Sequence, residues 1–190
     1  PKAFFKESVI GVPGLFKCWL KKNVGIVNAV GTGIADDKVV YSYVNKMITY
    51  YLGEQPILNQ VETFLCHDDT HRKYVIDNIS KLVVKPANAS GGYGILIGPK
   101  ASQKEKNETI DKIKHNPREF IAQPLEVLST APTITNSDIE PRHLDLRPFI
   151  LSGKNSYVTT GGLTRVALRK GSTIVNSSQG GGSKDTLIVD

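Results

Sequence analysis

The chain has 190 residues, of which 39% are hydrophobic and 22% charged, and its formal net charge is +6. This size and composition predict one globular unit or two small lobes that share a core. No apolar run approaches the roughly 20 residues of a membrane-spanning helix, so we expect no membrane partner. Lysines at 100–114 alternate with acidic residues, a pattern typical of a solvated helix face that argues against a nucleic-acid partner.

The two cysteines, Cys18 and Cys66, are too few for a disulfide framework and favour reduced thiols in a cytoplasmic protein. The chain begins with Pro1, and we interpret it as a piece of a longer protein. Residues 66–71 (CHDDTH) contain side chains that zinc prefers, but the cluster is single and crowded. A capped loop before a helix is the favoured interpretation of this stretch.

The first half of the chain alternates between helical and extended patterns. Residues 2–20 suggest irregular backbone, and the apolar run 24–30 predicts a buried strand entering a turn at 31–33. Asp36 and Asp37 can cap a helix whose apolar residues run from 39 to 48 and which ends near 52–53. Further along we expect a strand at 61–65, a helix at 74–79 and a strand at 81–85.

The second half is richer in strands. A glycine-rich turn at 89–94 precedes a strand at 95–97, which predicts a hairpin with the strand before it. A helix is expected at 108–114, ended by residues 116–117. Strand-like stretches follow at 120–122, 126–128, 144–151, 157–159, 165–168 and 173–175, and a second glycine-rich loop lies at 179–183.

Residues 82–86 (LVVKP) and 90–94 (SGGYG) form a pattern suited to polyphosphate. Glycines let backbone N–H groups approach phosphate oxygens, and Lys85 adds a point charge. The pattern is not a Walker A loop, because no Gly-Lys-Ser/Thr follows, and it is not a Rossmann fingerprint, because a strand follows Gly94. The alternative is an ordinary tight hairpin with an exposed lysine.

A second candidate stretch is 120–126 (FIAQPLE). Pro124 interrupts the strand and leaves backbone groups unpaired, and such groups can meet the edge of an adenine ring. An edge strand with a bulge explains the same residues equally well.

Charged side chains mark the last third. Asp145 and Arg147 share one strand face because strand side chains repeat with period two, and Arg165 follows on a later strand. Two arginines can stabilise a transferred phosphoryl group, whereas a surface ion pair is the simpler alternative. Residues 176–185 (NSSQGGGSKD) suit an anion-binding nest, with a flexible surface loop as the alternative.

Taken in order, these stretches resemble the circularly permuted branch of the ATP-grasp superfamily, whose proteins are described as similar to glutathionylspermidine synthase. The resemblance covers nearly the whole chain and includes 11–14 (GVPG), 27–33 (VNAVGTG), 82–86, 91–94, 121–124, 145–149 (DLRPF), 161–167 (GGLTRVA) and 176–186. No single motif is decisive, but the ordered set is specific.

The resemblance implies an α+β fold with two lobes, mainly antiparallel sheets and a nucleotide cleft. It divides the chain into an N-terminal α/β segment (1–80), a nucleotide-binding lobe (81–130) and a strand-rich catalytic lobe (131–190). Nucleotide contacts fall on Lys85, Ser90, Gly91, Gly92, Gly94, Gln123 and Leu125. We expect Arg147, Arg165, Asn176, Gln179 and Lys184 to converge at the phosphate end of the cleft and to act in catalysis.

The resemblance also implies Mg²⁺ beside ATP. An unpermuted ATP-grasp protein ends with a Glu-x-Asn magnesium motif, and residues 27–29 look like its counterpart moved to the front, with Asn28 and Asp145 as ligands. Ile26 stands where the motif has Glu, so one ligand is missing there.

The function implied is an ATP-dependent carboxylate–amine ligase that acts through an acyl phosphate. Its partners would be a small-molecule or peptide carboxylate, an amine acceptor and the missing domains of the full-length chain. We expect the 190-residue chain alone to fold but to be inactive. The alternative is a nucleotide-binding module without turnover, which the residue at position 26 favours.

Overall fold

The computed structural model describes residues 5–9, 11–28, 31–89, 91–135, 138–177 and 180–188. Its α-helices are α1 (Leu15–Leu20), α2 (Lys38–Tyr41), α3 (Val44–Leu52), α4 (Asp69–Asp77) and α5 (Gln103–His115). Its strands are β1 (Phe64–Leu65), β2 (Leu82–Pro86), β3 (Leu96–Ile97), β4 (Phe120–Pro124), β5 (Thr130–Ile134), β6 (Ile139–Ser152), β7 (Ser156–Ala167) and β8 (Gly181–Lys184). Short 3₁₀ helices cover Thr32–Asp36, Ile79–Lys81, Gly98–Lys100 and Pro117–Glu119.

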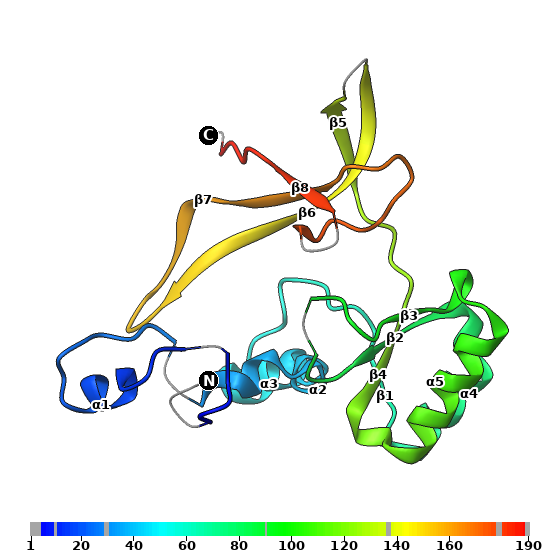
Figure 1. Ribbon diagram of the computed structural model, residues 1–190, viewed down its shortest axis with the longest axis horizontal. Helices are drawn as coiled ribbons and strands as arrows, with labels where there is room; N and C mark the ends of the chain where they lie inside the picture. Colours follow the sequence, from blue (N-terminus) through cyan, green and yellow to red (C-terminus); the bar gives the residue numbers. More distant parts are fainter. Residues whose placement is uncertain are drawn as a thin grey trace.

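The strands form two sheets of four, in the orders β1-β4-β2-β3 and β5-β6-β7-β8. Every pairing within them is antiparallel. Residues 125–129 join one sheet to the other, and the second sheet lies above the first in Figure 1. Two antiparallel sheets with helices around the first one confirm the predicted α+β class.

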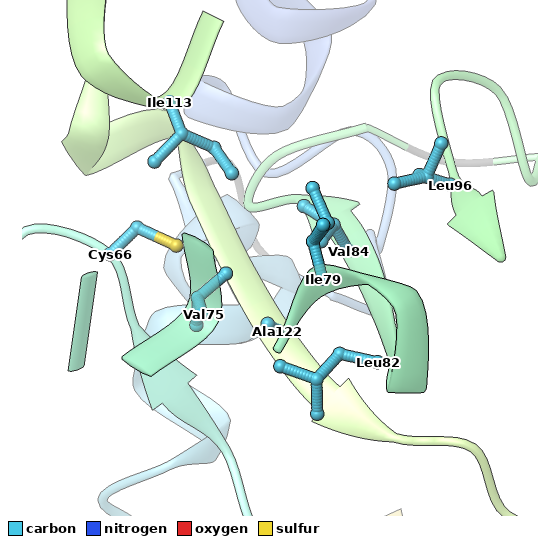
Figure 2. Packing of buried hydrophobic residues seen from close by; sticks show 8 residues of the cluster. All are labelled: Cys66, Val75, Ile79, Leu82, Val84, Leu96, Ile113 and Ala122. Carbon is cyan, nitrogen blue, oxygen red and sulfur yellow. The ribbon is translucent and has the colours of Figure 1, made fainter. Parts of the chain in front are cut away.

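One face of the first sheet carries the hydrophobic core. Leu82, Val84 and Ala122 point to this face, because side chains two apart on a strand share a side. They pack against buried residues of α4, α5 and their flanks, and Figure 2 shows the cluster. Ile113 of α5 is fully buried there, so α5 is fixed to the sheet by its apolar side while its lysines and acids face water.

The other face of the same sheet is only partly covered. Val39 of α2 packs there against Leu65, Ala87 and Ile121. Figure 1 shows α2 and α3 on the opposite side of the sheet from α4 and α5. Lys85 pairs directly with Ile121, so its side chain projects on this second face, away from the main core.

The second sheet is built on a long hairpin. β5 pairs with the first part of β6, and β7 pairs with the rest, with the register shifting between Pro148 and Ile150. β8 adds to the far side of β7. Figure 1 shows β6 and β7 extending together well beyond β8, which leaves the apolar side chains near the hairpin end exposed.

Several predicted elements are correct in type but differ in extent. The helix expected across 39–48 is divided into α2 and α3, with Asp37 as the N-cap of α2 and Gly53, at φ 69°, ending α3. α4 begins earlier than expected because Asp68 caps it. α5 also begins earlier, at a capping box formed by Ser102 and Glu105, and the spacing of these two residues in the sequence matches that motif.

Other predictions are wrong. The described part of 24–30 contains no strand and joins neither sheet, and Val27 is 83% exposed. Residues 15–20 form α1 rather than irregular backbone. The runs 126–128 and 173–175 are not strands, whereas part of the second glycine-rich loop is β8.

The predicted boundary between segments 1–80 and 81–130 falls inside the first sheet and its core. β1 and α4 come from the predicted 1–80 segment, yet they pack into the same core as β2 and β4. Among the described residues, no helix is both long and apolar enough to cross a bilayer.

Candidate nucleotide site

A cavity of about 420 Å³ lies between the first sheet and a segment of the second lobe. Its walls are the partly covered face of β2, β3 and β4, the linker after β4, and residues 173–176. Five residues predicted from the sequence line it, namely Lys85, Gly92, Gln123, Leu125 and Asn176. The volume falls in the range of small-molecule sites.

Lys85 supplies the positive charge of this cavity. Its Nζ donates a hydrogen bond of 2.6 Å to Gln123 Oε1. Burial, followed by the charge of Lys38, lowers the pKa of Lys85 below its ordinary value. Among the described residues no carboxylate forms an ion pair with Lys85, although Glu126 lines the same cavity.

The glycine-rich turn adjoins this lysine. Gly91, Gly92 and Gly94 have φ values of 72°, 80° and 71°, a region that side chains with a Cβ rarely adopt. A Cβ on Gly94 would also lie 3.0 Å from Pro86 Cγ. The turn therefore requires glycine, as expected for backbone that approaches a ligand. Ser90, the other predicted member of the turn, lies outside the described residues.

Lys38, which the sequence prediction missed, is a second lysine near the glycine-rich turn, although it does not line the cavity. Its Nζ donates to Ala89 O at 2.6 Å and to Ala87 O at 3.4 Å, at the start of the glycine-rich turn. Lys38 occupies the first position of α2, where a positive charge opposes the helix dipole. The sequence carries no signal for these contacts, because the two carbonyls lie about fifty residues further along the chain.

The predicted hinge residues lie where the first sheet ends. Pro124 is the last residue of β4 and pairs with Leu82 of β2. Leu125 follows it and lines the cavity. Gln123 is buried, at 8% exposure, and its amide contacts both Lys85 and Thr63.

Arg165 and Asp145 form a close ion pair in the second sheet. Arg165 Nε donates to Asp145 Oδ1 at 2.8 Å, and the other guanidinium contact is to Asp145 Oδ2. Arg147 Nε lies 3.8 Å from the same carboxylate. The hydrogen bonds from Arg165 lower the pKa of Asp145. None of these three side chains is among the residues that line the cavity.

The structure separates the five residues that were expected to converge. Arg147 and Arg165 meet at Asp145, and Asn176 lines the cavity. Lys184 pairs with Thr164, the neighbour of Arg165, so it projects from the opposite face of the sheet. Its Nζ donates to Pro132 O and to Thr133 Oγ1 of β5. Gln179 lies outside the described residues.

The residues predicted to bind Mg²⁺ do not form a metal site by themselves. Asn28 is exposed and has a positive φ of 63°. Asp145 accepts two hydrogen bonds from the Arg165 guanidinium, whose positive charge opposes a metal cation at the same carboxylate. The described residues contain no group of three His, Cys, Asp or Glu side chains suited to a metal.

The alternative zinc stretch at 66–71 is a capped loop. Asp68 accepts a hydrogen bond from His71 N at 2.8 Å, and His71 Nδ1 accepts one from Leu65 N at 3.2 Å. Cys66 is fully buried, and this burial raises the pKa of its thiol to about 11. These side chains therefore serve the start of α4 and the core.

A larger cavity, of about 470 Å³, lies beside α3 and residues 54–60. Its walls are mostly apolar, and its only charged lining residue is Glu54. Because polyphosphate requires cations or clustered N–H donors, the interlobe cavity is the better candidate despite its smaller volume.

Two antiparallel sheets, with a lysine and a glycine-rich turn at the cavity between them, agree with the ATP-grasp class of fold. The chain belongs to the circularly permuted ATP-grasp type 2 family, whose model matches residues 1–167.

Longer proteins from several bacteria are similar to this chain. An uncharacterised protein of Synechocystis sp. is 54% identical over 190 residues, which is all of this chain and 40% of the relative. A protein of Mycobacterium tuberculosis is 51% identical over the whole chain and 34% of its own length. A Frankia casuarinae protein provisionally named glutamate–cysteine ligase 2-2 is 50% identical over 179 residues, or 94% of this chain and 21% of the relative. The chain thus spans less than half the length of these relatives.

Proposed function

We propose that this chain binds ATP in the interlobe cavity and serves as the nucleotide-binding part of an ATP-dependent carboxylate–amine ligase. The observation that carries the proposal is the side chain of Lys85. It is partly buried, it projects into the cavity, and no carboxylate of the described residues pairs with it. A polyphosphate would supply the missing negative charge.

The phosphates would lie between Lys85, Lys38 and the glycine-rich turn. Lys38 reaches the carbonyl of Ala89, so both lysines lie at the same end of the first sheet. The positive φ values of Gly91, Gly92 and Gly94 suit backbone that presents N–H groups to an anion. Adenine would lie toward the linker, at Gln123 and Leu125, where β4 ends and backbone pairing stops.

The proposed reaction has two steps. A carboxylate oxygen of the first substrate attacks the γ-phosphorus of ATP, the bond to the β–γ bridging oxygen breaks, and ADP leaves. An amine nitrogen then attacks the carbonyl carbon of the acyl phosphate, phosphate leaves, and the nitrogen loses a proton. Positioning and neutralisation of charge account for most catalysis of this kind. Neither arginine lines the cavity, and Arg147 is the more exposed of the two, so Arg147 rather than Arg165 would be free to meet a phosphate.

Mg²⁺ commonly accompanies ATP where phosphoryl groups are transferred, and it would neutralise charge on the phosphates. Asp145 is paired with Arg165, and the described residues contain no group of three His, Cys, Asp or Glu side chains that could hold Mg²⁺. The name of the Frankia relative pairs a carboxylate donor with an amine acceptor, and it supports the same class of substrates for this protein.

A nucleotide-binding module without turnover is the second candidate. Ile26 in place of a magnesium-binding Glu, and the engagement of Asp145, favour it. The two candidates differ in ADP release by a full-length protein that contains this chain when carboxylate and amine substrates are supplied. Release that depends on both substrates supports the ligase, whereas ATP binding with no release under any pair supports the module.

The binding proposal is tested by calorimetry on Lys85→Ala. We expect ATP affinity to fall by about 1.5–3 kcal/mol, the range of a hydrogen bond to a charged group. Lys81→Ala is the matched control, because Lys81 precedes the same strand but is exposed. Equal affinity of Lys85→Ala and the unchanged protein would overturn the assignment.

A further inference from the structure

We infer that Thr63 is a positioning residue for the nucleotide site, and that it acts on Lys85 through the amide of Gln123. The inference rests on the proposed function, because Lys85 is assigned there to the phosphates. Thr63 itself does not line the cavity, and nothing in the sequence pattern marks it.

The fold sets Thr63, Gln123 and Lys85 side by side on one face of the first sheet. Thr63 directly precedes β1, Gln123 lies in β4, and Lys85 lies in β2. β1 pairs with β4 at Phe64 and Ala122, and extending that register by one residue sets Thr63 opposite Gln123. Gln123 pairs with Val83 of β2, and Lys85 is the diagonal neighbour on the same face. Thr63 Oγ1 accepts a 2.8 Å hydrogen bond from Gln123 Nε2, and Gln123 Oε1 accepts a 2.6 Å bond from Lys85 Nζ.

The direction of each hydrogen bond is fixed by one further contact. Thr63 donates its hydroxyl hydrogen to Val61 O at 3.0 Å. A hydroxyl has one hydrogen, so Thr63 can only accept from Gln123, and the amide must present its NH₂ group to Thr63. The Gln123 carbonyl then faces the lysine, which has donors only. The reversed amide would direct two donors at the ammonium group, and its carbonyl would face a hydroxyl that has no hydrogen left to give.

This arrangement prepares Lys85 before any ligand arrives. Gln123 is 8% exposed, so water cannot easily replace a lost partner of its amide. With the amide fixed, the ammonium group is held at the cavity wall and needs little reorganisation when an anion binds. Removing the Thr63 hydroxyl frees the amide to rotate and Lys85 to leave its position.

The test uses Thr63→Val, which keeps the shape and removes the hydroxyl, with Thr63→Ala as a second form without added bulk. We expect ATP affinity to fall about threefold to tenfold in both, the range of one net hydrogen bond. Thr63→Ser, which keeps the hydroxyl, should restore affinity to within about twofold. Thr49→Val is the control, because Thr49 is an exposed threonine on α3.

A double-mutant cycle separates positioning from simple weakening of the fold. If Thr63 acts through Gln123, adding Thr63→Val to Gln123→Leu causes no further loss of ATP affinity. Additive losses would overturn the inference, because they would mean that Thr63 acts by another route.

NMR of the nucleotide-free protein keeps the inference separate from the proposed function. The Gln123 side-chain amide signals, assigned by their loss in Gln123→Leu, should move and exchange faster in Thr63→Val but not in Thr63→Ser. Unchanged signals in Thr63→Val would overturn the role of Thr63, even if ATP binds at Lys85. A different outcome would refute the proposed function alone. The Gln123 amide signals would change in Thr63→Val, which supports the orienting role of Thr63, while Lys85→Ala would bind ATP as tightly as the unchanged protein.

Discussion

Lys85 combines an unfavourable location for a charge with the absence of a carboxylate partner among the described residues. Burial and the nearby charge of Lys38 both lower the pKa of Lys85 from the ordinary lysine value of 10.5. A polyphosphate bound at the same place would have the opposite effect, since it stabilises the ammonium form. The difference between the two states makes ligand binding depend on pH.

We predict that ATP binding takes up protons at pH values between the lowered pKa of free Lys85 and its higher pKa in the complex. Between the lowered pKa of free Lys85 and its raised pKa in the complex, the free lysine is partly neutral and the bound one is charged, so affinity falls as pH rises. Calorimetry in two buffers with different heats of ionisation measures this uptake. Lys85→Arg, which stays protonated, should show none. Equal uptake by Lys85→Arg and the unchanged protein would contradict the prediction.

At the residue scale, strand alternation was the part of the site that the sequence could predict. It places Asp145 and Arg147 on one face with Arg165 on a later strand, and in the structure both arginines contact Asp145. The expected convergence of Lys184 with the arginines does not follow from alternation, because the sequence predicts a loop at Lys184, whereas the structure has β8 there and sets Lys184 on the opposite face from Arg165. Lys38 was missed because its partners, the carbonyls of Ala87 and Ala89, lie about fifty residues away in sequence.

At the scale of elements, α2 depends on a single capping residue. Asp37 accepts a hydrogen bond from Val39 N at 2.8 Å, and Arg118 donates to the other carboxylate oxygen at 2.8 Å. The first of these satisfies an N–H group at the helix start, and the second ties α2 to the segment before β4. α2 carries both Lys38 and the buried Val39, so its cap also supports the site.

We predict that Asp37→Ala lowers the free energy of unfolding by about 0.5–2 kcal/mol, the usual effect of losing an N-cap. Arg118 first, and then Val39 N, lower the pKa of Asp37, so its contribution is present above the ordinary value of 3.8 and is lost as pH falls through the lowered pKa. Urea unfolding at neutral and acidic pH measures both effects. Asp36→Ala is the control, because Asp36 is exposed and does not cap α2. An equal change in both variants would refute the capping role.

Short helices and strands were the hardest elements to predict. An apolar run such as 24–28 has strand character, but a strand forms only where another strand can pair with it, and that depends on distant residues. The opposite case is β8, whose residues 181–183 are Gly-Gly-Ser. It forms because β7 offers an open edge, which overrides a poor local preference.

At the scale of the whole molecule, the order of motifs along the chain was more informative than any one of them. β2 carries Lys85, and β4 ends at the predicted hinge. The glycine-rich turn, β3 and α5 lie between β2 and β4 along the chain, and β2, β3 and β4 share one sheet. The order of these motifs agrees with the family whose model matches the chain. The cavity itself required residues 173–176 to lie over the first sheet. No local sequence pattern predicts the direction in which residues 125–129 lead the chain to the second sheet. The position of residues 173–176 at the cavity is therefore visible only in the structure.

We expect ATP to occupy the cavity between β2, β4 and residues 173–176, with its phosphates at Lys85. The most direct measurement is a crystal structure of the protein with a non-hydrolysable ATP analogue and Mg²⁺. We predict the adenine beside Gln123 and Leu125, and the phosphates within hydrogen-bonding distance of Lys85 Nζ and the glycine-rich turn. An analogue bound in the apolar cavity beside α3, or a fully bound analogue that makes no contact with Lys85, would contradict the claim.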